Sequence, residues 1–521
     1  MTGFVRQTLP ELFQDIPVMV LSASGMVPVP ITGIVCDSRS VQPGNLFLAL
    51  TGGSVDGHNY IPAAIEQGAV AVVGSRSQEG LPVPYIQVSD TRLALAHLAA
   101  AFYNFPARQL TMVGVTGTDG KTTTSNLIFQ ILLAAGYPAG VISTVNAVIG
   151  SEVVDTGFHV TTPQAPDVQH YLSRMLAAGL THVVLESTSH GLAQQRVTAC
   201  EFDIAVITNI THEHLDYHGS FQAYREAKAS LFTSLANTRK KKGGRPLAVL
   251  NRDDQSYDYL QQVTSVEQVD YSLRPGAAVW AQDIHYSAGG VDFMAIGPGF
   301  HLPIRTNLVG AFNVSNCLAA LAATMAGLGV PAEAAQRGIA ALPGVPGRME
   351  HIDLGQDFTA IVDFAHTPNA LRQALETVRL MTGGRILAVF GSAGLRDRQK
   401  RRMMAEVSVE LADLTFLTAE DPRSESLDDI LAEMALAGAS QGGKEGMNLW
   451  RVPDRGQAIR MAVQMAQPGD LVIACGKGHE QSMCFGTFEH PWDDRTAMRA
   501  ALAERIGLPG PAMPYLPTQD I

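Results

Sequence analysis

The stretch Gly114-Val-Thr-Gly117-Thr-Asp-Gly120-Lys121-Thr122-Thr123-Thr124 places three glycines three residues apart, directly before a Lys-Thr pair. An apolar, β-branched run over 110–115 precedes it and an amphipathic segment over 125–135 follows, which predicts a strand, a loop and a helix. In this context backbone N–H groups and a helix N-terminus can hold an anion. Lys121 can reach phosphate oxygens and Thr122 can bind Mg²⁺. The stretch therefore predicts a nucleotide site.

The loop departs at one position from a strict phosphate-binding loop. That pattern has a glycine five residues before Gly120, where this chain has Val115. The other glycines, the Lys-Thr pair and the position between strand and helix still favour a nucleotide site over a chance match. What the nucleotide is used for has to follow from residues elsewhere.

Composition limits the class of protein. The chain has 521 residues, 46% of them hydrophobic and 17% charged, which suits about three domains of ~150 residues each. The formal net charge of −12 argues against a nucleic-acid partner. A basic run, Arg239-Lys-Lys-Lys242, precedes two glycines and is typical of a solvated loop tip.

The cysteines and the apolar runs indicate the cellular compartment. The five cysteines are scattered and without CxxC spacing, which suits a reducing cytoplasm and argues against a zinc ribbon or a disulfide scaffold. Charged residues (Arg6, Glu11 and Asp15) interrupt the N-terminal apolar stretch, which is unlike a signal peptide. No uncharged apolar run reaches the ~18 residues of a membrane span. We expect a cytoplasmic protein without membrane insertion.

Three α/β regions are expected, over 1–108, 109–343 and 344–521, with the Pro-Gly-rich break at Leu342–Gly347 as a linker. Several strand candidates are continuous apolar runs, typical of parallel strands buried on both faces. Helices are expected over 92–103 and 313–328, and the Pro-rich tail 508–517 is expected to fray. The expected strands are 31–36, 46–49, 70–73, 85–88, 111–115, 140–143, 182–185, 204–208, 247–250, 359–364, 386–390, 414–418 and 471–475.

Polar residues that could carry chemistry follow two strands of the second region. Glu186 ends one strand and could bind the nucleotide's Mg²⁺, although a lone Glu at a strand end is more often part of an ion pair or a cap. His212, His214 and His218 fall within seven residues and suggest a metal or phosphate site without specifying one. Lys228 lies on an expected helix, where a lone lysine is usually exposed.

Taken in order, these motifs resemble those of the Mur ligases, ATP-dependent amide-forming enzymes of peptidoglycan synthesis. The resemblance spans nearly the whole chain. It implies a small N-terminal α/β domain that binds a UDP substrate, a central doubly wound P-loop ATPase domain and a C-terminal Rossmann-like α/β domain. The motifs that carry it are Gly114–Thr124, Glu186, His214-Leu-Asp216, Lys228, Gly310-Ala-Phe-Asn313, Gly347-Arg348 and Asp363-Phe-Ala-His366.

Within the family, three further motifs resemble the members that add a third, diamino residue to UDP-N-acetylmuramoyl-L-alanyl-D-glutamate. They are Thr161-Thr162-Pro163, residues 187–191 with Arg196, and Gly476-Lys-Gly-His-Glu480. An amine can replace a carboxylate oxygen only after activation, and ATP can supply it by forming an acyl phosphate. Because two anions must then meet, the site needs positive charge from Mg²⁺, Lys121 and helix N-termini.

The resemblance also implies two Mg²⁺ ions. Thr122 and Glu186 would bind one, and Glu186, His214 and a carbamylated Lys228 (N6-carboxylysine) the other. Carbamylation makes chemical sense, because a free ammonium repels a metal whereas a carbamate is an anionic oxygen ligand. The expected catalytic residues are Lys121, Glu186, His214 and Lys228.

Further contacts are implied residue by residue. Asp119 stands where the family more often has Asn, and it brings a negative charge beside the phosphates. Asn251 and Asp254 are expected near the adenosine, and the Gly52-Gly53-Ser54 turn near the uridine. The implied ATP contacts are Gly117, Thr118, Asp119, Gly120, Lys121, Thr122, Thr123, Asn313, Arg348, Asp363 and His366. The implied contacts to the UDP-muramoyl dipeptide are Ser38, Thr161, Thr162, Thr188 and Arg196.

The third region resembles the domain that selects the incoming amino acid. Arg423 matches an arginine that contacts the distal carboxylate of meso-diaminopimelate, and it favours that substrate. Glu420 and Asp421 replace Asp and Asn, however, and the added charge could suit the side-chain ammonium of L-lysine or L-ornithine. Alternatively, Arg423 itself neutralises Asp421. The expected amino-acid contacts are Arg396, Glu420, Asp421, Arg423, Gly476 and Glu480.

Other functions stay open at this stage. A folylpolyglutamate- or cyanophycin-type ligase shares the architecture, but it would not explain the motifs at Thr161-Thr162-Pro163 and Gly476–Glu480. A silent nucleotide-binding module would not need the full set of Lys121, Thr122, Glu186, His214 and Lys228. A kinase or motor is disfavoured by Val115. We expect a monomeric ligase whose partners are ATP, the UDP-muramoyl dipeptide and a diamino acid.

Overall fold

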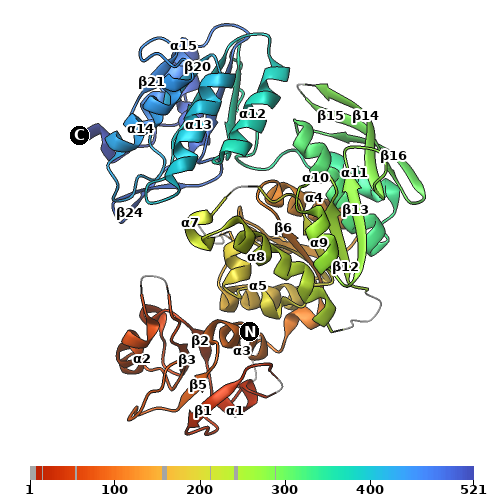
Figure 1. Cartoon of the computed structure of the whole chain (residues 1–521), viewed down its shortest axis with the longest axis vertical. Helices are drawn as coiled ribbons and strands as arrows, with labels where there is room; N and C mark the ends of the chain where they lie inside the picture. Colours follow the sequence, from red (N-terminus) through yellow and green to blue (C-terminus); the bar gives the residue numbers. More distant parts are fainter. Residues whose placement is uncertain are drawn as a thin grey trace.

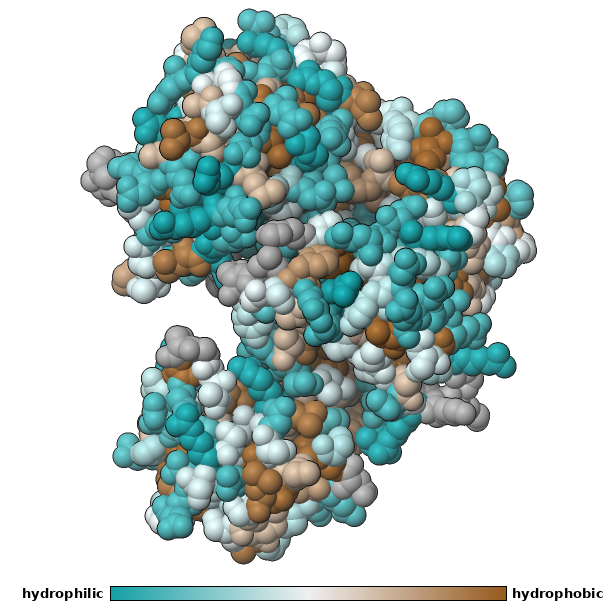
Figure 2. Space-filling view, in the orientation of Figure 1, coloured by the Kyte–Doolittle hydropathy of each residue, from teal (hydrophilic) through white to brown (hydrophobic). Residues whose placement is uncertain are grey.

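The computed structural model describes residues 7–14, 16–52, 55–154, 161–211, 213–239, 245–287 and 289–520, without the side chains of 215, 216, 519 and 520. Three sheets follow one another along the chain, each with its own helices (Figure 1). In the space-filling view a broad indentation separates the N-terminal lobe from the C-terminal one (Figure 2). The expected fold, three α/β domains, is confirmed.

The N-terminal sheet has five strands in the order β1-β5-β4-β3-β2. Only β1 runs antiparallel, and it pairs with β5 at the edge of the sheet. Asp90 caps the helix α3 by accepting from the N–H groups of Arg92 and Leu93. The elements are α1 (Leu9–Leu12), β1 (Val20–Ser24), β2 (Gly33–Val35), β3 (Asn45–Leu48), α2 (Ile61–Glu66), β4 (Ala71–Gly74), β5 (Tyr85–Val88) and α3 (Thr91–Phe102).

The central sheet has eleven strands in the order β16-β15-β14-β13-β12-β11-β6-β10-β7-β8-β9. Its middle is parallel, and β6 lies between β10 and β11, so three carboxyl ends meet at one edge. The strands are β6 (Thr111–Thr116), β7 (Ala139–Ile142), β8 (Ala147–Ile149), β9 (Glu152–Val154), β10 (His182–Glu186), β11 (Ile204–Ile207), β12 (Leu247–Asn251), β13 (Glu267–Ser272), β14 (Val279–Ser287), β15 (Gly290–Gly297) and β16 (Phe300–Thr306).

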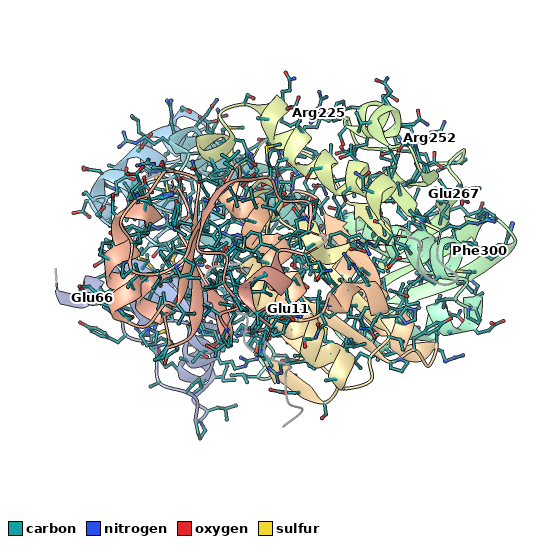
Figure 3. All side chains as sticks on the ribbon, turned by 90° about the horizontal axis from the view of Figure 1, so that it is seen from below. Glu11, Glu66, Arg225, Arg252, Glu267 and Phe300 are labelled. Atoms are coloured by element: carbon teal, nitrogen blue, oxygen red, sulfur yellow. The ribbon has the colours of Figure 1, made fainter. Side chains whose placement is uncertain are left out.

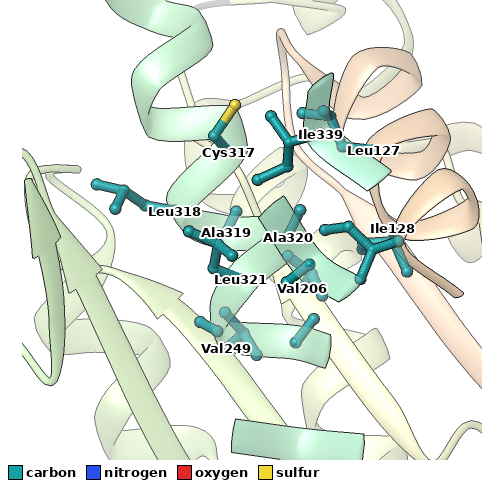
Figure 4. Packing of buried hydrophobic residues seen from close by; sticks show 14 of the residues in the cluster. Leu127, Ile128, Val206, Val249, Cys317, Leu318, Ala319, Ala320, Leu321 and Ile339 are labelled. Carbon is teal, nitrogen blue, oxygen red and sulfur yellow. The ribbon is translucent and has the colours of Figure 1, made fainter. Parts of the chain in front are cut away.

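Helices cover both faces of this sheet. In Figure 4 apolar side chains of α4, α10 and α11 meet Val206 and Val249 of the sheet, and all of them are buried. This packing fixes the start of α4, and with it the glycine loop. The helices are α4 (Lys121–Ala134), α5 (Ala165–Ala177), α6 (Ser189–Ala193), α7 (Leu215–His218), α8 (Phe221–Ser234), α9 (Tyr257–Val263), α10 (Ala311–Leu321) and α11 (Ala332–Ala341).

The C-terminal sheet has six strands in the order β17-β18-β22-β19-β20-β21, and β17 alone is antiparallel. A hairpin of β23 and β24 lies between β22 and α16. The elements are β17 (Glu350–His351), β18 (Thr359–Asp363), α12 (Pro368–Met381), β19 (Ile386–Phe390), α13 (Arg398–Leu411), β20 (Leu414–Leu417), α14 (Leu427–Ser440), β21 (Leu449–Arg451), α15 (Arg455–Met465), β22 (Leu471–Cys475), β23 (Ser482–Phe485), β24 (Phe488–Pro491) and α16 (Asp494–Ile506).

One expectation about the chain was wrong. The tail 508–517 does not fray: Leu516 is 0% exposed in the core beside Trp492, and Thr518 Oγ1 donates to Asp454 Oδ2 at 2.8 Å. The helix expected over 313–328 is present: residues 311–328 are helical, with α10 up to Leu321, a π-helical turn over Ala322–Ala326 and two further α-helical residues.

Charged side chains mark the outside of the molecule. Glu66, Arg252 and Glu267 are exposed and lie toward the rim in the view from below (Figure 3). Across the described residues, no helix combines the length and the apolar character needed to cross a membrane. Of the basic run expected at a loop tip, residues 240–242 lie outside the described residues.

Candidate active site

The glycine loop connects β6 to α4 at the meeting point of the three strand ends. Gly117 and Gly120 have φ angles of +150° and +80°, which side chains rarely adopt. A Cβ at Gly117 would clash with the Thr208 hydroxyl after β11, and one at Gly120 with the Asn316 carboxamide of α10. Backbone conformation and crowding therefore both require glycine here.

Lys121 and Thr122 open α4. Lys121 Nζ donates to the carbonyl of Thr118 at 2.8 Å, and burial lowers its pKa. Thr122 Oγ1 lies 3.0 and 3.1 Å from the two carboxylate oxygens of Glu186. Glu186 is 1% exposed and also accepts from the N–H of Thr144 at 3.0 Å. The strand register thus brings together the two residues predicted to share a Mg²⁺.

Lys228 lies inside the protein, so the exposed position usual for a helical lysine does not apply. It is 1% exposed, and its Nζ donates to the carbonyl of Gly117 at 2.6 Å. The Nζ also lies 4.7 Å from the ring centroid of Tyr224. Burial, with the charge of Lys121 next in effect, lowers the pKa of Lys228 well below its usual value. A lysine of α8 is therefore buried against the glycine loop.

The histidine-rich segment forms an aromatic cluster. The rings of His214 and His190 meet edge to face, with centroids 4.7 Å apart, and His218 packs against Tyr217 and Tyr224. Burial lowers the pKa of His214, which favours the neutral ring. His212 lies outside the described residues, and in the part of the chain that is described no three His, Cys, Asp or Glu side chains are arranged as metal ligands.

The segment from the linker to α12 closes over the glycine loop. Arg348 Nη2 donates to Thr122 Oγ1 at 3.4 Å, and its guanidinium lies 4.2 Å above the ring of Phe364. Asp363 accepts from the N–H groups of Met349 and Ala365 at 2.7 and 2.8 Å, which fixes the end of β18. His366 Nδ1 lies 3.1 Å from the carbonyl of Phe364.

These residues line a cleft between the central and C-terminal domains. It is lined by residues 118–123, Asn313, Arg348, Asp363 and His366 among others. An adjoining cleft is lined by Asn251 and Asp254. The nucleotide contacts predicted from four separate segments thus face one space.

A second cluster continues from Glu186 toward the N-terminal domain. Thr162 Oγ1 lies 3.1 Å from the carbonyl of Glu186 and 3.0 Å from Thr188 Oγ1, and Arg196 Nη1 donates to the carbonyl of Thr162 at 2.6 Å. Burial and then the charge of Arg92, on α3, lower the pKa of Arg196. The N-terminal domain therefore borders this cluster.

Other predicted contacts to the UDP substrate are placed less fully. Ser38 begins a 3₁₀ turn, Ser38–Ser40, which Asp37 caps. Thr161 is partly exposed and follows residues 155–160, which lie outside the described residues. Gly53 and Ser54 of the predicted uridine turn also lie outside them.

The predicted amino-acid contacts come from three segments of the C-terminal domain. Asp421 accepts from Lys477 Nζ, which lies 3.0 and 3.2 Å from its carboxylate oxygens. Lys477 is 0% exposed and also pairs with Glu480 at 2.6 Å. Arg423 Nη1 instead donates to the carbonyl of Gly394 at 2.8 Å. The alternative in which Arg423 neutralises Asp421 is therefore wrong, because Lys477 does so.

Glu420 lies beside this ion pair. It is 6% exposed, and burial raises its pKa to about 7. A Cβ at Gly476, whose φ is +110°, would clash with the Glu420 carboxylate. Gly476 therefore leaves the space that this carboxylate fills. Arg396 is exposed and lies in the loop between β19 and α13.

Comparisons with known proteins identify the family. Three family models match the chain: the Mur ligase family catalytic domain over residues 30–103, the Mur ligase middle domain over 115–324 and the Mur ligase glutamate ligase domain over 347–478. The chain is 44% identical over 483 residues to the UDP-N-acetylmuramyl-tripeptide synthetase of Roseiflexus sp. (strain RS-1), covering 91% of this chain and 95% of that protein. The chain belongs to the Mur ligase family. The predicted family and enzyme class, an ATP-dependent amide ligase, are confirmed.

Further relatives carry more specific names. The UDP-N-acetylmuramoyl-L-alanyl-D-glutamate--2,6-diaminopimelate ligase of Geobacillus kaustophilus is 42% identical over 476 residues, covering 91% of this chain and 95% of that one. A solved structure of a ligase of that name superposes with a TM-score of 0.65 at 31% identity, covering 96% and 100% of the chains. MurF of Acinetobacter baumannii, at 21% identity over 97% and 99% of the chains and a TM-score of 0.66, shares the fold.

Two residues of this Mur ligase's site were missed from sequence. Lys477 lies within a quoted motif but was given no role. Lys400, on α13, pairs with Glu213 of the central domain at 3.5 Å. Burial raises the pKa of Glu213, and its Oε2 has no hydrogen-bond partner among the described residues. The signal that could have found Lys400 is its position in the first turn of a helix after a strand's carboxyl end, where charged residues face the site.

Proposed function

We propose that the chain joins meso-2,6-diaminopimelate to the D-Glu side-chain carboxylate of UDP-N-acetylmuramoyl-L-Ala-D-Glu, with release of ADP and phosphate. The observation that carries this is the burial of Lys228 against the carbonyl of Gly117, on the same loop where Thr122 meets Glu186. A kinase or a passive nucleotide module does not need this buried lysine. The names of the relatives supply the substrate class.

The proposed reaction has two steps. A carboxylate oxygen of the substrate attacks the γ-phosphorus of ATP, the bond to the β-phosphate oxygen breaks, and an acyl phosphate and ADP form. The amine then attacks the acyl carbon, phosphate leaves with the bonding electrons and the nitrogen loses a proton. Lys121 and the N-terminus of α4 offset the charge of the two anions that meet.

The donor set of the loop fits Mg²⁺. Thr122 and Glu186 present oxygen atoms within 3.1 Å of each other, the ligand type that this ion prefers beside phosphates. When bound, Mg²⁺ would neutralise phosphate charge. We propose two ions, the second held by Glu186, His214 and Lys228. A carbamate on Lys228 suits this position, because it replaces a buried cation beside Lys121 by oxygen ligands.

The choice of diaminopimelate rests on the charges of the amino-acid pocket. Asp421, the residue that suggested an ammonium side chain, already pairs with Lys477. Glu480 pairs with the same lysine. Arg423 keeps guanidinium donors for a distal carboxylate, a planar match that a lysine substrate would leave unused. Glu420, Gly476 and Arg396 complete the proposed contacts.

The remaining assignments follow the same division of the chain. We propose 1–108 as the uridine domain with Ser38, 109–343 as the ATP domain and 344–521 as the amino-acid domain. Thr161, Thr162, Thr188 and Arg196 would contact the muramoyl dipeptide. The nucleotide would contact Gly117, Thr118, residues 120–123, Asn313, Arg348, Asp363 and His366, and Asp119 lines the same cleft. We propose a monomer that acts in the cytoplasm.

A substrate panel tests the proposal. Phosphate release would be measured with purified protein, ATP, the UDP-muramoyl dipeptide and diaminopimelate, lysine or ornithine. We expect turnover that depends on the dipeptide and is fastest with diaminopimelate. Faster turnover with lysine or ornithine would overturn the choice of amino acid, and no turnover with any of the three would overturn the reaction.

A further inference from the structure

The backbone of Asp119 is fixed to the end of β11. Its N–H donates to Asn209 Oδ1 at 2.9 Å. Its carbonyl accepts from Thr208 Oγ1 at 2.6 Å and from Asn209 Nδ2 at 3.2 Å. Three hydrogen bonds therefore hold this residue within the glycine loop, and its side chain leaves the loop in a set direction.

That direction leads to the C-terminal domain. Asp119 Oδ2 accepts from Asn369 Nδ2 at 3.3 Å, across 250 positions of the chain. Asn369 is the second residue of α12, whose start is fixed because Thr367 Oγ1 accepts from the N–H of Ala370 at 3.0 Å. Both partners are thus held by their own domains, and their contact joins the two domains.

The contact differs in charge from its neighbours. Two other contacts from the C-terminal domain to the central domain are made by positively charged side chains: Arg348 contacts Thr122 and Lys400 contacts Glu213. Asn369 brings a neutral carboxamide to an acidic residue on a phosphate-binding loop. A carboxylate there repels the phosphates, so an ATP ligand is a poor role for it. A hydrogen-bond acceptor for the closing domain is a better one.

We propose that Asp119 and Asn369 form a positioning pair that sets the C-terminal domain against the glycine loop, and that Asp119 acts through this contact rather than as an ATP ligand. This proposal rests on the proposed function for its activity measurement. In this role the Asp119 carboxylate, which is unfavourable beside phosphate, helps to hold the closed arrangement of the two domains.

The pair has a property that a purely local role would lack: it can be reversed. A double variant that combines Asp119→Asn with Asn369→Asp would keep one donor and one acceptor. The exchange would also move the carboxylate from the phosphate loop to the N-terminal turn of α12, where the helix dipole favours it. In Asn369→Asp alone two carboxylates would face each other, and like charges at this distance repel.

Four proteins test the pair by phosphate release: the wild type, Asp119→Asn, Asn369→Asp and the double variant. We expect Asn369→Asp to lower kcat/KM for ATP about 30-fold and Asp119→Asn about 3-fold, within the coupling typical of contacting residues. In the Asn369→Asp background, Asp119→Asn should instead raise kcat/KM about 10-fold. A double variant as slow as Asn369→Asp, or slower, would overturn the proposal.

Two controls separate this pair from other causes. Lys400→Met weakens a different contact between the domains, and Asp119→Asn should not rescue it. Small-angle scattering with an ATP analogue measures closure without turnover. Asn369→Asp should stay more open than the wild type, and the double variant should close again. If the wild type released no phosphate, the proposed function would fail, but scattering would still test the Asp119–Asn369 pair. Equal closure in all four proteins would refute the pair.

Discussion

The glycine loop and the amino-acid pocket are built from the sequence in opposite ways. The loop lies within one continuous run from β6 to α4, and its partners come from the two neighbouring strands: Glu186 ends β10 and Thr208 follows β11. The pocket is assembled from residues 391–401, 420–423 and 476–486, which meet only in the folded domain. At the loop, burial lowers the pKa of lysines; in the pocket, carboxylates pair with a buried lysine.

The difference concerns where charge is neutralised. Lys121 and Lys228 lie at the loop without a bonded carboxylate among the described residues, each donating to a backbone carbonyl. Such a site is completed by anions from outside, which agrees with a nucleotide and a carbamate. The pocket instead pairs Lys477 with both Asp421 and Glu480, and Arg423 is the group proposed to select the substrate.

The largest effect is expected at the loop. Lys228→Ala should lower kcat at least about 1,000-fold, because the proposed oxygen ligand for Mg²⁺ is removed. Short carboxylates such as acetate should restore part of the activity by entering the space that the side chain leaves. Phosphate release measures both.

Lys444→Ala is the matched control, since Lys444 is exposed, and it should keep full activity. If Lys228→Ala were active without added carboxylate, the metal role would be contradicted. The glycine loop would then not need an anion from outside, and its contrast with the amino-acid pocket would be weaker.

In the pocket the largest effect should fall on stability. Lys477→Met would remove the cation that pairs with the buried Asp421 and with Glu480, and breaking a buried ion pair typically costs about 3–5 kcal/mol. The free energy of unfolding from urea titration measures it. Asp421→Asn combined with Lys477→Met should recover part of the loss, because one of the stranded charges is then removed. A loss of unfolding free energy below about 1 kcal/mol would show that Lys477 does not offset the charge of these carboxylates.

The contrast also explains what the sequence could predict. Continuous apolar runs predicted the parallel strands, and the glycine spacing predicted the loop, because these signals are local. The pairing of Lys477 with Asp421 depends on how β20 and the end of β22 are placed side by side, which no local pattern encodes. Leu516 was missed for a related reason: its Pro-rich surroundings suggest a loop, but its burial depends on packing with residues distant in sequence, such as Ile459 and Trp492. The antiparallel strands β14–β16 were not predicted, although β16 alternates buried and exposed residues.

Glu420 offers a test of the pocket by pH. Burial raises its pKa from 4.5 to about 7, so between these values the folded state binds a proton that the unfolded state has lost. Stability from this group is therefore present below about pH 4.5 and is lost as pH rises toward 7, by about 3 kcal/mol at most. Glu420→Gln should lack this part of the slope. The measurement is the free energy of unfolding of both proteins at pH 5 and pH 8, and equal slopes would contradict the burial effect.

The smallest effect is expected from Asp421→Asn, and it decides between the two substrate classes. If Asp421 selected an ammonium, the change would weaken lysine or ornithine and alter the order of preference. Because the carboxylate pairs with Lys477 and also accepts from the N–H of Cys484 at 2.9 Å, an Asn carbonyl oxygen can keep both donors. We expect diaminopimelate to remain preferred, with KM changed about 3-fold, typical of a retained but weaker hydrogen bond. Competition between diaminopimelate and lysine in one reaction measures the order directly, and a reversal would return Asp421 to the role of substrate selector.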